Sequence, residues 1–113
     1  MKWMVGSDIH GSEFFAEKLV KAYKKEGATK LLLLGDILYH GPRNDLPLGY
    51  SPKGVIRLLN PLKRDIVCVR GNCEAEVDQM VLEFPVLTDH VILENENLTI
   101  YMCHGHHENN ENP

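Results

Sequence analysis

The sequence predicts an α/β fold in a chain of 113 residues. Apolar runs of strand length alternate with segments of helical spacing as far as residue 85, which is typical of a parallel sheet connected by helices. Beyond residue 85, two further strands surround a polar turn, which predicts antiparallel pairing at the end of the domain. Polar residues that can bind metal ions follow four of the strands. We therefore expect a functional site at one edge of the sheet.

The first part of the chain predicts a strand, a helix and a second strand. Residues 2–7 are a short apolar-rich run, and residues 30–34 are a continuous apolar run, typical of a strand buried on both faces. Residues 13–26 between them have helical spacing, with Ser12 as the cap and Gly27 at the end. The apolar positions of this helix are Phe15, Leu19, Ala22 and Tyr23.

The middle of the chain predicts a loop, a short helix and a third strand. Residues 39–52 are rich in Gly, Pro and Asn, which favours a loop. Ser51 as the cap and Pro52 at the first helical position then begin a short helix, and residues 65–70 form the next strand. The apolar positions of the helix are Val55, Ile56, Leu58 and Leu59.

The last part predicts a third helix and a hairpin. Residues 74–83 read as a helix that Pro85 stops, and strands at residues 90–93 and 98–103 flank a polar turn. Val77, Met80 and Val81 share one side of the third helix. We expect the apolar helical faces to form the core, including Phe15, Tyr23, Leu58 and Met80.

The charge balance does not favour a polyanionic partner. Twelve basic and sixteen acidic residues give a formal net charge of -4, and no Lys/Arg cluster marks one face. Nucleic-acid binding is therefore not expected, and a small-molecule substrate is favoured.

Hydropathy and cysteine placement predict a cytoplasmic protein that makes no membrane contact. No apolar run approaches the roughly 20 residues that span a bilayer, and the N-terminus has no signal-peptide core. Cys68 and Cys103 lie inside apolar runs, which is typical of buried reduced thiols rather than disulfides.

Four short motifs carry the candidate chemistry, and each follows an apolar run. They contain Asp8 and His10, then Asp36, then Asn72, and finally His104. Any one of these alone is as well explained as a helix cap or a turn residue. Four in the same structural position predict a shared site at the carboxyl ends of the strands.

These residue types suit two divalent ions held close together. Such a pair needs a bridging carboxylate, imidazoles and a carbonyl oxygen, and it polarises a phosphoryl oxygen and supplies the hydroxide for in-line attack on phosphorus. Asp36 can bridge, Asp8 and His10 can hold one ion, and Asn72 and His104 can hold the other. Mixed nitrogen and oxygen ligands suit Mn²⁺, Zn²⁺, Fe²⁺ or Co²⁺ better than Mg²⁺.

The order and spacing of these motifs resemble the calcineurin-like metallophosphoesterases. The segments 40–44 and 76–80, together with Cys73, resemble more narrowly the YfcE-type bacterial phosphodiesterases. The resemblance implies a phosphodiesterase, commonly manganese-dependent, and makes residues 1–113 the N-terminal portion of a four-layer α/β/β/α sandwich. It also implies ligand roles that agree with the assignment above, and catalytic positions at Asp36, Asn72 and Cys73.

Two further residues, Cys73 and Arg43, each have a functional and a structural interpretation. Cys73 stands where many members of the superfamily have a histidine that helps to protonate the leaving group, so the proton would come from a metal-bound water or from elsewhere. It could be a reactive thiolate or a small residue beside the ligands. Arg43 could orient a substrate phosphate or simply pair with Asp45 at the surface.

The last family motif, Gly-His-x-His at the end of a later strand, is missing. His106 and His107 do not supply it, because no strand follows His104. We therefore expect a truncated, incomplete domain in which each ion lacks one protein ligand. The second sheet would lack strands, and its uncovered edges and apolar surface make self-association plausible.

Two function classes follow. The first is a binuclear metal-dependent phosphodiesterase that uses metal-bound hydroxide. The alternative is a catalytically inactive remnant or protein-interaction module on the same fold. The missing motif favours the alternative, whereas the joint presence of five ligand residues favours the enzyme.

Overall fold

A computed structural model describes residues 2–40, 45–95 and 97–105 of the chain. Its first layer is a parallel sheet of β1 (Trp3–Gly6), β2 (Lys30–Leu33) and β3 (Ile66–Cys68), in the order β1-β2-β3. Leu31 pairs with Met4 on one side and with Ile66 on the other, so β2 is the central strand. These strands confirm the three predicted parallel strands, each slightly shorter than its apolar run.

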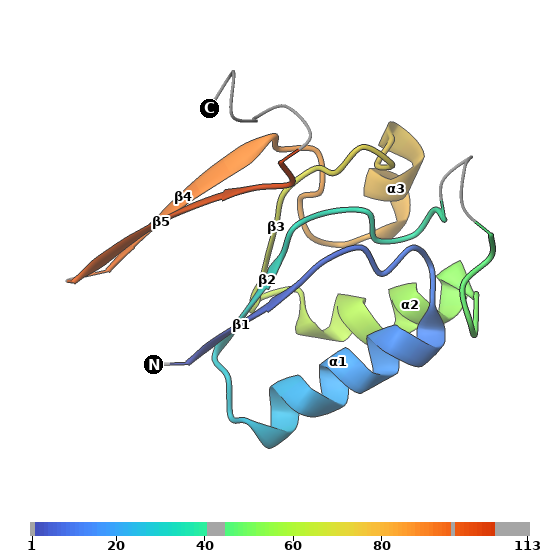
Figure 1. Cartoon of the computed structure of the whole chain (residues 1–113), viewed down its shortest axis with the longest axis horizontal. Helices are drawn as coiled ribbons and strands as arrows, with labels where there is room; N and C mark the ends of the chain where they lie inside the picture. Colours follow the sequence, from blue (N-terminus) through green and yellow to red (C-terminus); the bar gives the residue numbers. More distant parts are fainter. Residues whose placement is uncertain (1, 41–44, 96, 106–113) are drawn as a thin grey trace.

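Two helices cover one face of this sheet (Figure 1). They are α1 (Glu13–Lys25) and α2 (Pro52–Leu59), and a single 3₁₀ turn, η1 (Asn60–Leu62), extends α2. The predicted caps are confirmed, because Ser12 Oγ accepts from the Phe15 amide and Ser51 Oγ accepts from the Gly54 amide. Each cap satisfies an amide that the helix leaves without an acceptor.

The opposite face packs against the predicted hairpin, which is formed by β4 (His90–Asn95) and β5 (Leu98–Cys103) in antiparallel pairing (Figure 1). Side chains alternate along β2, so Leu31 and Leu33 join the helix-side cluster while Leu32 joins Met102 of the hairpin. The layers are therefore helices, parallel sheet and hairpin. On the outer face of the hairpin, the paired side chains of Ile92 and Tyr101 are each more than half exposed.

The third helix, α3 (Glu76–Val81), is shorter than predicted, and its predicted core face is wrong. Met80 is 83% exposed and Val77 is 62% exposed. The reason lies in Gln79, whose amide binds the carbonyls of Leu82 and Phe84 and the amide of Val86. These bonds fold the segment after α3 back under the helix. Leu82, Phe84 and Val86 then fill the core in place of the apolar helix face.

The prediction of a core position for Phe15 is also wrong. Phe15 is 51% exposed and meets the ring of Phe14 edge-on, with centroids 5.2 Å apart. The buried stripe of α1 is Ala16, Val20 and Tyr23, which begins one residue later and therefore points about 100° around the helix. Tyr23 is buried as predicted, and Leu58 packs at the edge of the same cluster.

The structure bears on the predictions about the cysteines and about membrane-spanning segments. Cys68 is buried as predicted, Cys103 is only half-buried, and neither forms a disulfide among the described residues. Among the helices that the structure describes, none has both the length and the apolar character to cross a membrane.

The observed orientation of α3 predicts unequal effects on stability at two neighbouring apolar residues, Met80 and Phe84. Phe84→Ala should lower the free energy of unfolding by about 3–5 kcal/mol, because Phe84 is only 2% exposed and its loss leaves a cavity. Met80→Ala should change it by less than about 0.5 kcal/mol, since Met80 faces solvent. Urea unfolding of both variants measures this difference. Equal losses would mean that α3 packs with its apolar face inward.

Candidate metal centre

The predicted site residues come from four chain segments that end at the same edge of the structure. Asp8 and His10 follow β1, Asp36 follows β2, Asn72 follows β3, and His104 follows β5. Parallel strands end together at one edge of a sheet, and the hairpin packed on that sheet brings the end of β5 to the same edge. The structure therefore brings all five predicted ligands together.

Backbone hydrogen bonds continue the pairing of β1 with β2 into the loops that carry the ligands. The amide of Asp8 donates to the Gly35 carbonyl at 3.0 Å, and the amide of His10 donates to the Asp36 carbonyl at 2.8 Å. Asp8, His10 and Asp36 all have left-handed φ values, between 52° and 57°. Such a conformation costs roughly 1–3 kcal/mol in a non-glycine residue and persists only where its surroundings impose it. Here the paired loops impose it.

Asp36 lies at the middle of the site and is only 2% exposed. Its Oδ1 accepts from the backbone amide of Cys73 at 2.8 Å, and its Oδ2 lies 3.2 Å from His104 Nε2. A Cβ atom at Gly71 would lie 2.4 Å from Asp36 Oδ1, so this approach requires glycine. Gly35, with φ 99°, likewise approaches Gly71 too closely for a side chain.

The two histidines are oriented in the same way. Nδ1 of His10 lies 2.9 Å from the Tyr39 carbonyl, and Nδ1 of His104 lies 2.5 Å from the Leu34 carbonyl. A hydrogen bond to a carbonyl requires the proton on Nδ1, which leaves Nε2 as the ligand atom. Nε2 of His10 lies 3.1 Å from Asp8 Oδ1 and 3.8 Å from Asp36 Oδ2. Both imidazoles thus present Nε2 to the carboxylates.

Two groups of possible ligand atoms result, and they share Asp36. Asp8, Asp36 and His104 form one group, and His10, Asp36 and Cys73 form the other, with the atoms of each group within 4.8 Å of one another. The predicted division of ligands differs from this grouping, since it places Asp8 with His10 on one ion. That division stays a prediction.

The Asn72 side chain lies against the same carboxylate. With its nitrogen turned toward Asp36, it donates to Oδ2 at 2.6 Å and to Oδ1 at 3.0 Å. Turned by 180°, the amide would present its oxygen at this place, where a cation shared with Asp36 can be held. The donor set of imidazole nitrogens, carboxylates and an amide oxygen fits a manganese-type or zinc-type divalent ion.

The electrostatics of the centre favour bound cations. Partial burial opposes ionisation of Asp8, but the Ser7 hydroxyl, the contact with Asp36 and the neighbouring imidazoles of His104 and His10 give its pKa a net downward shift. Asp8 is therefore an anion across the neutral range. Beside it, Asp36 adds a second carboxylate with little exposure to water.

Glu74 positions the loops of the centre, a role that the sequence pattern does not reveal, because residues 74–83 read as a helix. The residue is 4% exposed and lies in the loop before α3. Its Oε1 accepts from the amides of Asp36 at 2.6 Å and Gly71 at 2.9 Å, and its Oε2 accepts from the amide of Ile37 at 3.1 Å. Burial raises the pKa of this carboxyl, the Asp36 carboxylate adds to the rise, and the backbone hydrogen bonds oppose it. Glu74 thus joins the loops after β2 and β3.

Cys73 borders the centre with a protonated thiol. Burial, together with the carboxylates of Asp36, Glu74 and Asp8, raises the pKa of the thiol to about 11. A thiolate is therefore disfavoured at neutral pH in the chain without bound cations. Arg43, the predicted substrate contact, lies outside the described residues, as does His106.

Comparison with known proteins identifies related chains. The family model of the calcineurin-like phosphoesterases matches residues 1–113. Phosphodiesterase YfcE of Escherichia coli strain K12 is 46% identical over 108 residues, which cover 94% of this chain and 58% of the relative. YfcE of strain O157:H7 matches with the same values. The chain therefore spans less than two thirds of the length of these relatives.

Solved structures agree on the fold. The structure of YfcE, a phosphoesterase from Escherichia coli, matches with a TM-score of 0.96 and 44% identity, over 99% of this chain and 62% of that one. A conserved protein from Streptococcus pneumoniae, predicted to be a phosphoesterase, matches with a TM-score of 0.51 and 21% identity, over 92% of this chain and 45% of that one. The close match bears out the predicted fold as an N-terminal portion of the metallophosphoesterase sandwich.

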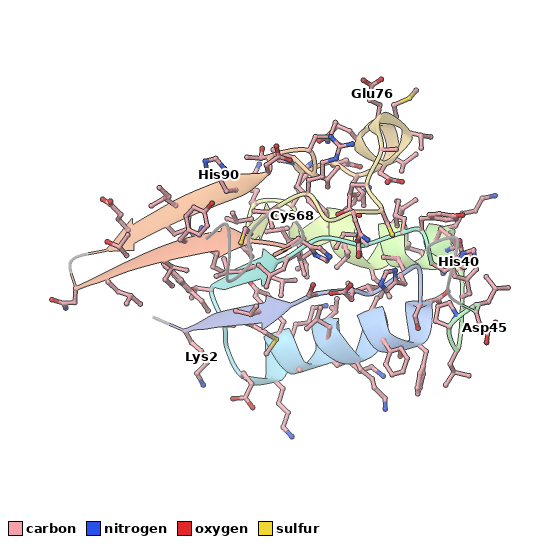
Figure 2. All side chains as sticks on the ribbon, turned by 45° about the horizontal axis from the view of Figure 1, so that its top comes forward. Lys2, His40, Asp45, Cys68, Glu76 and His90 are labelled. Carbon is pink, nitrogen blue, oxygen red and sulfur yellow. The ribbon has the colours of Figure 1, made fainter. Side chains whose placement is uncertain are left out.

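The role of Glu74 can be tested against an exposed glutamate two residues away. Glu74→Ala should lower the free energy of unfolding by at least about 3 kcal/mol, because three buried amides lose their acceptor. Glu76→Ala is the control, since Glu76 points away from the molecule on α3 (Figure 2) and should change stability by less than about 1 kcal/mol. Urea unfolding measures both. If Glu74→Ala lowers the free energy of unfolding no more than Glu76→Ala does, Glu74 does not hold the two loops together.

The thiol of Cys73 should alkylate slowly. With a pKa raised from 9.0 to about 11, its thiolate fraction at pH 8 is about 100-fold lower than that of an unperturbed cysteine. Iodoacetamide labelling of the chain in EDTA, read at Cys73 by peptide mass spectrometry, should therefore accelerate steadily from pH 8 to pH 11. A rate that levels off below pH 9 would contradict the raised pKa.

Proposed function

The chain belongs to the calcineurin-like phosphoesterase family, and from this premise we propose that it binds two divalent cations and hydrolyses a small-molecule phosphodiester. The observation that carries the proposal is the position of Asp36. A buried carboxylate shared by two groups of ligand atoms suits a bridge between two ions. Both histidines that face it have Nδ1 engaged by a backbone carbonyl.

We assign the ligand roles to Asp8, His10, Asp36, Asn72 and His104. Manganese is the proposed metal, because a mixed set of imidazole and oxygen ligands suits it better than magnesium. When bound, two such ions polarise the phosphoryl oxygens and supply hydroxide at neutral pH. The chain's own contribution is to fix the ligands: Glu74 and the paired loops hold Asp36 in place, and two carbonyls orient the imidazoles.

The acidic character of the chain supports a small substrate rather than a polynucleotide. Its formal net charge is -4, and its sequence has no basic cluster that would attract a phosphate backbone. The proposed role of Cys73 is that of a protonated neighbour of the substrate, since its pKa is raised to about 11. Arg43 stays a predicted substrate contact, and the cytoplasmic location and self-association stay predictions as well.

A second candidate is a protein that binds metal without turnover, either an inactive remnant or an interaction module. Its support is that the chain spans 58% of the length of its relative, so the activity of YfcE is not transferred to this chain as a whole. Hydrolysis separates the two candidates, whereas metal binding alone does not.

The bridging role of Asp36 predicts the loss of both ions when this residue is changed. Asp36→Ala should weaken manganese binding by at least about 100-fold, because removing even an indirect partner of a ligand costs 10–100-fold. Asp89→Ala is the control, since Asp89 is an exposed carboxylate outside both ligand groups. Isothermal titration with MnCl₂ measures the affinity, and circular dichroism confirms folding. If Asp36→Ala binds manganese as tightly as the parent chain, the bridge is wrongly assigned.

The activity itself is tested with bis(4-nitrophenyl) phosphate. The 113-residue chain should release nitrophenolate only with Mn²⁺ present, and Asp36→Ala should reduce the rate to the uncatalysed level. The comparison is a chain lengthened to the full span of the relative. Manganese binding with hydrolysis only in the lengthened chain would support the second candidate for this polypeptide.

A further inference from the structure

A cavity of about 370 Å³ lies beside the metal centre, between α2, α3 and the loop after β2. Its volume falls in the range of pockets that hold small molecules, roughly 300–1,000 Å³. Tyr39 and Tyr50 line it from the loops, Ile56 from α2, and Val77 and Val81 from α3. This explains in part why the apolar face of α3 is turned away from the core, because Val77 and Val81 form a wall of the cavity.

The cavity adjoins the metal centre, because two of its lining residues also contact that centre. Cys73 lines the cavity, and its sulfur also lies within 4.8 Å of the ligand atoms of His10 and Asp36. Tyr39 lines the cavity as well, and its carbonyl holds the His10 imidazole at 2.9 Å. A molecule with its phosphate on the metal centre would therefore extend into this space past the Cys73 thiol.

The walls exclude a second anionic group. Among the described lining residues, the one charged side chain is Asp78, and its carboxylate accepts from the Ala75 amide at 2.9 Å. A phosphate or carboxylate in the cavity would meet this negative charge with no basic lining residue to balance it among those described. The other walls are aliphatic or aromatic.

Aromatic side chains form part of the cavity wall outside α3, where Tyr39 and Tyr50 line it. The ring of His40 packs edge-on against Tyr39 and Tyr50, with centroid distances of 4.8 Å and 5.3 Å. His40 lies at the end of the molecule remote from the hairpin turn (Figure 2). Such a rigid wall favours a flat, apolar ring as the occupant.

We propose that this cavity binds an uncharged, aromatic ester group of a phosphodiester whose phosphate lies at the metal centre, so that the cavity selects the substrate. The proposal rests on the proposed function for its orientation, because the phosphate must sit at the metal centre. Fragment binding in the cavity does not depend on metal or turnover. The cavity proposal and the proposed function can therefore be refuted independently of each other.

The first test titrates phenol into the chain in EDTA and follows the methyl groups of Ile56, Val77 and Val81 by NMR. We expect saturable shifts at these methyls and none at the exposed Met80 methyl. An absence of saturable shifts in the cavity would overturn the proposal, whatever the activity of the chain.

The second test uses a matched pair of variants on α3. Val77→Asp places a charge on the cavity wall, whereas Met80→Asp places the same charge on an exposed residue that does not line it. With Mn²⁺ present, the parent should bind diphenyl phosphate at least about tenfold more tightly than dimethyl phosphate, because only the former buries a ring. Val77→Asp should abolish this preference, and Met80→Asp should retain it. Equal affinity of the parent for both phosphates, or equal effects of the two variants, would overturn the proposal.

Discussion

The buried carboxylate of Glu74 is the interaction on which the metal centre depends. It accepts three backbone hydrogen bonds, two from the loop after β2 and one from the loop after β3, and so joins the loops that carry Asp36 and Asn72. A carboxylate accepts several amides more strongly than a neutral side chain would, and this offsets its removal from water. The raised pKa of Glu74 records the remaining penalty of burial. Because Glu74 accepts from the amide of Asp36, joining the loops also fixes the backbone of Asp36.

Other features of the centre follow from that position. The close approach of the two loops leaves no space for a side chain at Gly35 or Gly71. The pairing of the Asp8 and His10 backbone with the loop after β2 then imposes left-handed conformations on both residues. This strain is local and is stored where the ligands lie. The site is thus fixed by backbone hydrogen bonds before any cation is bound.

Packing of the hairpin against the parallel sheet, rather than strand pairing with it, positions the proposed ligand His104. No strand pairing joins β4 or β5 to the described parallel sheet, and Met102 instead packs with Leu32 and Val69 between the two layers. His104 follows at the end of β5, where the Leu34 carbonyl orients its ring toward Asp36. Apolar contact between layers therefore decides the position of His104, a proposed ligand that is 68 residues away in sequence from Asp36. The geometry of the candidate metal centre therefore depends on the apolar cluster between the sheet and the hairpin.

The sequence alone determined the order of strands and helices, the capping serines and the identity of the predicted ligands. These depend on local rules: apolar runs, helical spacing, and polar residues directly after strands. Tertiary structure decided which helix face is buried. Val77, Met80 and Val81 look like a core stripe, but Gln79 folds the following segment into that place, and periodicity cannot reveal such a competitor. It also decided the role of Glu74, because the amides of Asp36 and Ile37, which lie in a loop distant in sequence, become its partners only when the chain is folded.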